Sequence, residues 1–352
     1  DLTSSANAVL RITSVGVTAG AGQGGLVTYG SPTISASIVF DPSAASGGSA
    51  ASGEGVIYVG GTTTLTGNVT ANGLTKFGNG ILILNGNTQV QGATSANGFA
   101  VQAGTLRIGS SAALLAGVTA LNVNLGATVD LNGNTLRVGS LNAAANNSGG
   151  LITNDSATAA NLTVASSAFS SVWAGQIQDG AGVVSLSKMG SGTLTLAPNR
   201  VDSPFSNDNS FTGGTNLFGG RLTVQNVFGL GGAAGSTPGT LNLYSTGTAG
   251  ATIVDLFGDA TSGAVNGVIK YGNQSGNGLN VNVRGLAAIN VDRVGGSAVG
   301  NLIQIGDLTF GNQILTVTGA NSYGLRVAGT TNIAGQFATI NPTTTGPSGR
   351  VE

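Results

Sequence analysis

The sequence predicts an all-β repeat protein, and three observations support this fold class. A long stretch that begins at Leu74 returns further along the chain, taking Lys76 to Lys188, an offset of 112 residues (188 − 76). Short β-prone segments follow one another at intervals of roughly eight to twelve residues, separated by Gly and Asn. The composition combines 61 Gly with 40% hydrophobic and only 5% aromatic residues. Such a composition suits thin repeated layers better than one large core.

The internal repeat organises the whole sequence, because self-similarity at a fixed period is typical of solenoids and repeat arrays. The first copy runs from Leu74 to Ser110 and the second from Leu186 to Gln225, with an insertion at 201–205. The shared positions are Lys76/Lys188, Gly78/Gly190, Gly80/Gly192, Leu82/Leu194, Leu84/Leu196 and the closing Gly104/Gly220. We therefore expect the copies to form equivalent layers of a stack.

Comparison of the two copies assigns the faces of one strand. Two alternate positions keep Leu in both copies, whereas the positions between them change from Ile to Thr. The invariant pairs are Leu82/Leu194 and Leu84/Leu196, and the variable pairs are Ile81/Thr193 and Ile83/Thr195. Because successive side chains of a strand point to opposite faces, the leucines are expected inside and the variable residues outside.

The order KxGxGxLxL, a short Asn/Gly turn, and then Ala-Gly or Gly-Gly before a strand resembles the passenger-associated β-strand repeat of autotransporters. Segments 127–141, 149–154, 161–164 and 177–188 fit the same pattern. The resemblance implies a right-handed parallel β-helix, or β-solenoid, that forms a single elongated rod. It also implies an extracellular or bacterial cell-surface location, in a chain that continues beyond this sequence.

Taken in order, the chain is expected to form three segments. Residues 1–73 are N-terminal rungs with a surface loop at 41–54, residues 74–185 hold the first copy, and residues 186–352 hold the second. Each copy is followed by further rungs. Alternation from Thr33 to Phe40 predicts a half-buried strand.

Other architectures fit the turn chemistry less well. Sandwiches and barrels share the strand spacing, but irregular turns such as 85–87 and 132–134 favour the corners of a coil over matched hairpins. The best helical candidate, 112–121, is weakened by Gly and β-branched residues in its middle. A GxGxxG sequence at 20–25 lacks a following helix, so a turn is expected there rather than a dinucleotide site.

Several classes of function are disfavoured by composition. The chain has no Cys and no His, which removes the usual nucleophilic triads, the preferred zinc ligands and an unperturbed pH switch. The net charge is −1 and the 12 basic residues are scattered, so nucleic acid is a poor partner. No apolar run is long enough for a transmembrane helix. We therefore predict no catalytic residue, cofactor or metal site.

The enzyme hypothesis depends on paired carboxylates, since β-helices can carry polysaccharide-cleaving sites that need two of them. The nearest pairs in sequence are Asp202 with Asp208 and Asp255 with Asp259. Aspartates beside turns usually accept hydrogen bonds from their own backbone, so turn formation is the preferred interpretation. Calcium binding by these aspartates is disfavoured for the same reason.

The basic residues and the single Trp of the repeat region also have a functional and a structural interpretation. Lys76 and Lys188 could be recognition points, but solvated charges that protect strand edges are the preferred interpretation. The same is expected of Arg107, Arg137 and Arg221. Trp173 could be a sugar platform, and covering the edge of the core is preferred.

These features predict a structural, surface-exposed or secreted passenger rod without enzyme activity. An adhesin that binds a host, matrix or polysaccharide ligand through its loops is the alternative, and a polysaccharide-cleaving enzyme is a third. The expected partners are other copies of the chain or adjoining segments of a longer one. Phe77, Ile81 and Ile83 form a candidate self-contact stripe, because the whole chain offers little charge to keep copies apart.

Overall fold

The computed structural model of the chain describes residues 8–12, 23–40, 54–90, 98–111, 119–142, 149–165, 170–197, 208–245, 252–259, 267–272, 276–335, 338–343 and 351–352. The chain divides into two compact units, 1–165 with 180–182 and 166–179 with 183–352. The described parts of both units consist of short strands, with one 3₁₀ turn, η1 (Ala233–Gly235), in the second. The predicted all-β class is confirmed.

In the first unit, consecutive strands belong to different parallel sheets, and each strand pairs with strands of the neighbouring coils. Sheet A contains β1 (Val9–Ile12), β4 (Ser37–Phe40), β7 (Val69–Ala71) and β10 (Thr88–Val90). Sheet B contains β2 (Gln23–Thr28), β5 (Glu54–Val59), β8 (Gly73–Phe77), β11 (Phe99–Val101), β13 (Ala120–Val123) and β16 (Ser140–Asn142). Sheet C contains β3 (Thr33–Ile34), β6 (Thr62–Leu65), β9 (Ile81–Leu84), β12 (Gly104–Ile108), β14 (Ala127–Asp130) and β17 (Leu151–Thr153), and β15 (Thr135–Val138) pairs with β18 (Ala160–Val164).

The second unit is built on the same plan. Sheet D contains β21 (Val184–Lys188), β23 (Thr215–Leu217), β25 (Leu241–Leu243), β28 (Val281–Val283), β31 (Leu308–Phe310) and β34 (Thr331–Ile333). Sheet E contains β19 (Ser171–Trp173), β22 (Thr193–Leu196), β24 (Arg221–Val224), β26 (Thr252–Phe257), β29 (Ala287–Asp292), β32 (Ile314–Gly319) and β35 (Thr339–Thr343). Sheet F contains β27 (Val268–Lys270), β30 (Leu302–Ile305) and β33 (Gly324–Val327), and the unit also holds β20 (Gln176–Ile177).

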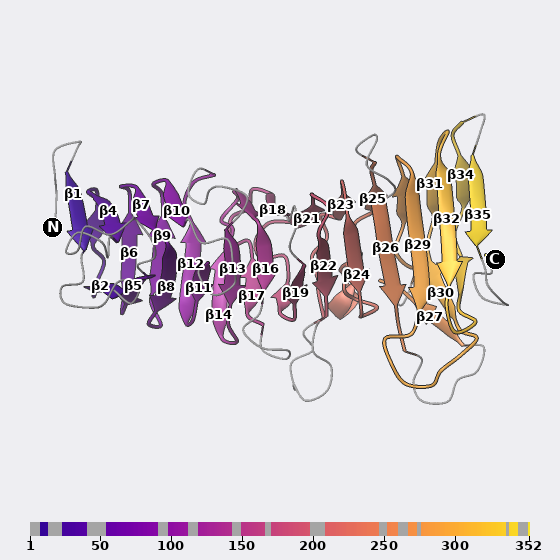
Figure 1. Ribbon diagram of the computed structural model, residues 1–352, viewed down its shortest axis with the longest axis horizontal. Helices are drawn as coiled ribbons and strands as arrows, with labels where there is room; N and C mark the ends of the chain where they lie inside the picture. Colours follow the sequence, from indigo (N-terminus) through magenta and orange to yellow (C-terminus); the bar gives the residue numbers. More distant parts are fainter. Residues whose placement is uncertain are drawn as a thin grey trace, which may run out of the picture. The chain divides into compact units, whose positions relative to one another are not determined.

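This arrangement is a parallel β-helix, in which each coil lays its strands on those of the coil before it. In Figure 1 the strands of each unit lie side by side in chain order within their sheets. Coil length varies: register partners Val56 and Thr75 are 19 residues apart (75 − 56), whereas Leu241 and Val281 are 40 apart (281 − 241). Longer coils extend the corners between strands and leave the stack unchanged.

The core is a set of inward columns in which each apolar side chain lies on its counterpart in the next coil. Leu82 stacks on Leu106 and then Val129, and all three are fully buried. Leu194, Leu222 and Val254 form the equivalent column of the second unit. The predicted inward leucines are confirmed, and Ile81, Ile83, Thr193 and Thr195 are half-buried on the outer side.

Buried asparagines tie the corners of adjacent coils together. The Asn154 side chain is fully buried, and its Oδ1 accepts from Gly133 N at 2.7 Å while its Nδ2 donates to Thr158 O at 2.8 Å. Asn209, also fully buried, bonds Ile177 N and Gly229 O in the same way. An amide suits this position because it offers both a donor and an acceptor to corner backbone groups.

Two local expectations are corrected. The strand expected from Thr33 to Phe40 is divided into β3 and β4, which belong to different sheets, because the alternation continues through a corner at Ser35 and Ala36. The turn expected at 20–25 is wrong at Gly24 and Gly25, which lie in β2. A Cβ at Gly24 would come within 2.7 Å of Ile12, so close packing explains that glycine.

Other expectations lie outside the described residues, namely 41–53 of the predicted loop, 20–22 of the GxGxxG sequence and 112–118 of the helical candidate. The handedness of the coil and the segment boundaries at 73 and 185 stay predictions. In the part of the chain that the structure describes, no helix has the length and apolar character needed to span a membrane.

Candidate functional site

The lysine that opens the first repeat copy lies inside the coil. Lys76 is fully buried in the inward column that contains Ile57 and Val101. Its Nζ donates to Gly78 O at 2.8 Å and to Ala103 O at 2.7 Å. Gly78 forms the corner of its own coil and Ala103 the matching corner of the next, so the ammonium group joins two coils. We call this arrangement the lysine clamp.

The second copy builds the same clamp. Lys188 is fully buried in the inward column of Leu217, and its Nζ donates to Met189 O at 2.8 Å, Gly190 O at 3.0 Å and Gly219 O at 3.4 Å. Gly190 and Gly219 occupy the places of Gly78 and Ala103. The expectation that both lysines are solvated is wrong. The corner carbonyl groups inside the coil need a hydrogen-bond donor, and the long lysine side chain supplies one.

The glycines of the repeat make this corner possible. Gly78 and Gly190 have φ angles of 81° and 76°, a left-handed conformation that side chains other than Gly rarely adopt. A Cβ at Gly104 would lie 2.5 Å from both Gly78 O and Gly80 O, and the equivalent contacts at Gly220 are as short. The lysine and glycines of KxGxG, together with the later Gly104 or Gly220, are therefore the residues that two stacked corners require.

Burial changes the acid–base properties of both lysines. Desolvation lowers the pKa of Lys76 and of Lys188 from 10.5 to about 8. The ammonium form therefore persists at neutral pH, where its protons face carbonyl oxygens that can only accept. An unfolded lysine titrates near ~10.4, so the burial cost is fully present below pH ~8 and disappears as pH rises above ~10.5. An amine of this pKa could act as a base, but full burial keeps it from any substrate.

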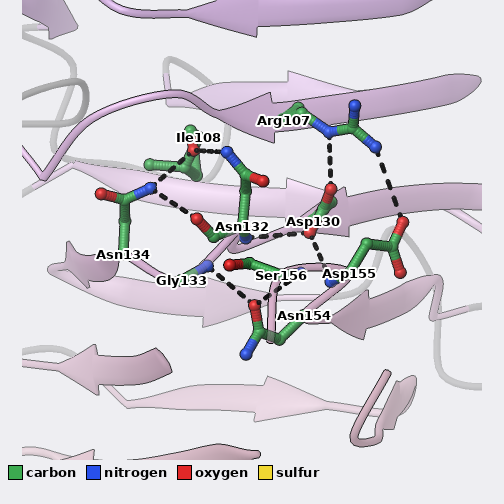
Figure 2. A network of polar contacts seen from close by, with 9 residues as sticks. All are labelled: Arg107, Ile108, Asp130, Asn132, Gly133, Asn134, Asn154, Asp155 and Ser156. Atoms are coloured by element: carbon green, nitrogen blue, oxygen red, sulfur yellow. Dashed lines mark hydrogen bonds and ion pairs between the residues drawn. The ribbon is translucent and has the colours of Figure 1, made fainter. Parts of the chain in front are cut away.

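A buried carboxylate follows each clamp. In the first unit, Asp130 in β14 is fully buried and its Oδ2 accepts from Arg107 Nε at 2.7 Å. Its Oδ1 accepts from Asn132 N at 2.9 Å and Asp155 N at 3.0 Å. Arg107 also lies 3.6 Å from Asp155 Oδ2, as Figure 2 shows. The carboxylate thus binds the coil before it, its own corner and the coil after it.

Amide groups continue the same network along the corner. Asn132 and Asn134 both donate to Ile108 O, at 3.3 and 2.9 Å. The Asn154 Oδ1 atom accepts a hydrogen bond from Gly133 N. Figure 2 places these side chains in one chain of contacts beside Asp130 and Arg107. Asn132 has a φ of 48°, which Asn tolerates better than most residues. The network satisfies backbone groups at three consecutive coils.

The second unit has the equivalent carboxylate in Asp255 of β26, which is 1% exposed. Arg221 donates to both of its oxygens, from Nε at 2.6 Å and from a terminal nitrogen at 2.8 Å. Thr223 Oγ1 donates to Oδ2 at 2.6 Å and Asn290 Nδ2 to Oδ1 at 2.7 Å. This fork-shaped contact raises the pKa of Arg221 above its usual value.

These contacts correct two further expectations. Arg107 and Arg221 are not simply solvated, since each neutralises a buried carboxylate in an adjacent coil. Asp255 does not lie beside a turn, because it belongs to the middle of a strand. Arg137 is exposed, as expected. The arrangement is suited to holding coils together and leaves neither Asp130 nor Asp255 accessible to a substrate.

The two described members of the remaining candidate carboxylates have different partners. Asp259 Oδ1 accepts from Val294 N at 3.0 Å and Gly295 N at 3.3 Å, which are backbone groups far along the chain and not those of its own turn. Asp208 Oδ1 accepts from Asn226 Nδ2 at 2.7 Å. Asp202 lies outside the described residues. Among the residues with described positions, no three acidic side chains gather as a metal-ligand group.

The aromatic and apolar candidates also have defined places. Trp173 is fully buried, so its indole belongs to the core and offers no sugar platform. Ile81 and Ile83 lie in sheet C beside Thr62, Thr64 and Thr105. Phe77 is 41% exposed at the end of β8 in sheet B, where its register partner is Tyr58. The predicted stripe therefore spans a corner between two sheets.

Asp130 was not identified from the sequence, although a signal exists. The tripeptide Val-Asp-Leu occurs at 129–131 and again at 254–256, after each copy of the repeat. The inward lysines also have a signal. Lys follows an inward Leu by two positions in both copies, as Leu74/Lys76 and Leu186/Lys188, so strand alternation places it inside.

Comparison with known proteins identifies the segments that carry the clamps. Residues 74–108 and 186–224 match the family model described as passenger-associated-transport-repeat. The resemblance inferred from the lysine and glycine pattern is confirmed. No match was found among curated proteins or among solved structures.

Proposed function

We propose that this chain, whose passenger-associated-transport-repeats imply the passenger domain of an autotransporter, is a structural scaffold on the outside of a bacterial cell. One observation supports the scaffold role above all. The residues that define the repeat act inside the coil, where the lysine and the glycines tie one coil to the next. The repeat therefore encodes a stack, and sites for other molecules must come from positions that the motif leaves variable or from residues outside it.

The absence of enzyme activity is part of the proposal, and it rests on the burial and the hydrogen-bond partners of the carboxylates. Asp130 and Asp255 are buried and neutralised by arginine, and Asp259 accepts backbone N–H groups. A glycoside-cleaving site needs two carboxyl groups that face a substrate across a groove. These three carboxylates do not support such a site.

Labelling of intact bacteria tests the location. Antibodies raised against the folded chain should bind unpermeabilised cells that express the parent protein. Labelling that requires permeabilised cells would contradict a surface or secreted scaffold.

Self-association is the finer part of the proposal, through the stripe of Phe77, Ile81 and Ile83. The two isoleucines are half-buried on an outer sheet face, and the second copy has Thr in their places. Ile81→Thr with Ile83→Thr should weaken self-association in sedimentation velocity while leaving the urea unfolding midpoint within error. Val172→Thr, an exposed apolar position 45% exposed in sheet E, is the matched control and should change nothing. Equal self-association of the double variant and the wild type would remove the stripe from the proposal.

A further inference from the structure

The outer face of sheet B carries aromatic side chains that the core does not use. Tyr29, directly after β2, is 69% exposed, Tyr58 in β5 is 40% exposed, and Phe77 in β8 is 41% exposed. Val27, the register partner of Tyr58, is 62% exposed. Two exposed rings on consecutive strands and a third directly after the preceding strand form an aromatic row, and apolar surface of this kind commonly marks a binding surface.

The two tyrosines of this row lie against each other and against the backbone. The ring centroids of Tyr29 and Tyr58 lie 5.9 Å apart with an interplanar angle of 51°. The Tyr29 ring lies directly over Gly60, where a Cβ would come within 2.6 Å of the ring. Gly60 therefore provides the space that the ring occupies.

Amide side chains continue the row on the next strands. Gln102 is the residue directly after β11, and Asn124 is the residue directly after β13. Both continue the register row of Phe77, because Lys76, Val101 and Val123 are register partners. Asn124 Nδ2 donates to Gln102 Oε1, and the Asn124 Oδ1 atom is buried. The neighbouring row of the same face runs from Val56 through Thr75 and Ala100 to Asn122, and its Thr75 and Asn122 are buried, at 5% and 9% exposure. These two described rows contain no charged residue, and Glu54, at the opposite end of β5, accepts from Thr75 Oγ1.

The corresponding row of the second unit is different, because its rings cover one another. Phe218 and Tyr244 stack with centroids 4.6 Å apart at 15°, and the Arg284 guanidinium lies 5.7 Å from the Tyr244 centroid. Phe218 follows β23, Tyr244 follows β25 and Arg284 follows β28, so this row is a closed stack along the coils. Among the described residues, the exposed rings of the first unit therefore differ from those of the second, which pack on one another and on Arg284.

We propose that the outer face of sheet B binds an unbranched neutral glycan, laid across the strands along the aromatic row and its amides. A pyranose ring has an apolar C–H face that packs on an aromatic ring, and a rim of hydroxyl groups that hydrogen-bonds the tyrosine hydroxyls and the Gln102 amide. The row from Val27 to Asn124 crosses five strands, about 19 Å at ~4.8 Å per strand, which suits a chain of several sugar rings. An acidic polymer would need Arg or Lys in these rows. This inference goes beyond the scaffold role, since it assigns a ligand to a sheet face.

Calorimetric titration with cellohexaose, a neutral β-linked hexasaccharide, tests the assignment on the whole chain. We expect binding by the wild type, and at least a ~10-fold higher Kd for Tyr29→Ala with Tyr58→Ala, since lost ring stacking on this scale removes most of the contact. Tyr29→Phe with Tyr58→Phe keeps both rings and should retain Kd within about 3-fold. Tyr244→Ala removes an outward ring of the second unit and should leave Kd unchanged.

Several outcomes would overturn the assignment. These are no binding of cellohexaose by the wild type, an unchanged Kd in the double alanine variant, or tighter binding of hexagalacturonate than of cellohexaose. Loss of self-association in the double alanine variant without saccharide, together with unchanged saccharide binding, would assign the face to a second copy of the chain. Unfolding midpoints in urea check that each variant is folded. None of these outcomes alters surface labelling, so the scaffold proposal is tested separately.

Discussion

The two copies of the repeat build the same clamp, but the arginine that neutralises the following carboxylate lies at a different strand position in each copy. Both have a buried lysine on two stacked corners and an aspartate one coil later. In the first copy, Arg107 lies directly opposite Asp130 in the register, whereas in the second, Thr223 is opposite Asp255 and Arg221 reaches it diagonally. The lysine position is therefore fixed by the corner, while the arginine needs only to be within reach of the carboxylate.

This difference shows which parts of the repeat geometry are rigid. The corner requires left-handed glycines and a donor at one place, and no neighbouring position can substitute. The carboxylate lies on a regular sheet, where both the opposite residue and its diagonal neighbour come close to the same side chain. Selection for the same contact can then accept Arg at either place.

The largest expected effect concerns what the copies share. Leu82→Asp and Leu194→Asp each place an unpaired carboxylate in a fully buried column and should lower the free energy of unfolding by about 4 kcal/mol or more. Ile81→Asp and Thr193→Asp, one residue away on the outer side, should cost under ~1 kcal/mol each. Urea unfolding measures both. Similar losses at inner and outer positions would mean that the faces are wrongly assigned.

A smaller effect should separate the copies. Arg221→Ala removes a two-point contact from Asp255 and should cost about 2 kcal/mol, leaving Thr223 and Asn290 as donors. Arg107→Ala should cost about 1 kcal/mol, because backbone N–H groups still hold Asp130. Urea unfolding of the two variants, with the exposed Arg137→Ala as control, gives the order. A larger loss at Arg107 than at Arg221 would contradict this account of the two networks.

Much of the fold could be predicted from the sequence, because the repeat and strand alternation report directly on stacking. The inward leucines follow from one strand, 81–84 in the first copy and 193–196 in the second, whose two versions differ only at outer positions. The lysine clamp was missed because the general preference of charged groups for water was given more weight than the alternation that places Lys76 inside. Only the position of the corner carbonyls reveals why an ammonium group is stable there.

The carboxylate networks and the aromatic row could not be predicted, for a different reason. Both depend on which residues of successive coils lie opposite each other, and coil length varies from 19 to 40 residues between described register partners (75 − 56 and 281 − 241). Tyr29 and Tyr58 are 29 residues apart in sequence (58 − 29), and Arg221 and Asp255 are 34 apart (255 − 221). No fixed spacing in the sequence pairs them.

The central claim, that the repeat lysines are interior clamps, is tested most directly by NMR of the lysine side chains. The chain has three lysines, Lys76, Lys188 and Lys270, so selective ¹⁵N labelling of lysine gives three ammonium signals. We expect two signals that titrate with pKa values of about 8 and exchange slowly with water at neutral pH, each lost in Lys76→Met or Lys188→Met. The Lys270 ammonium lies at the surface and serves as the internal reference. Titration of the Lys76 and Lys188 signals near ~10.4, the value of a solvated lysine, with fast exchange of both, would contradict the clamp.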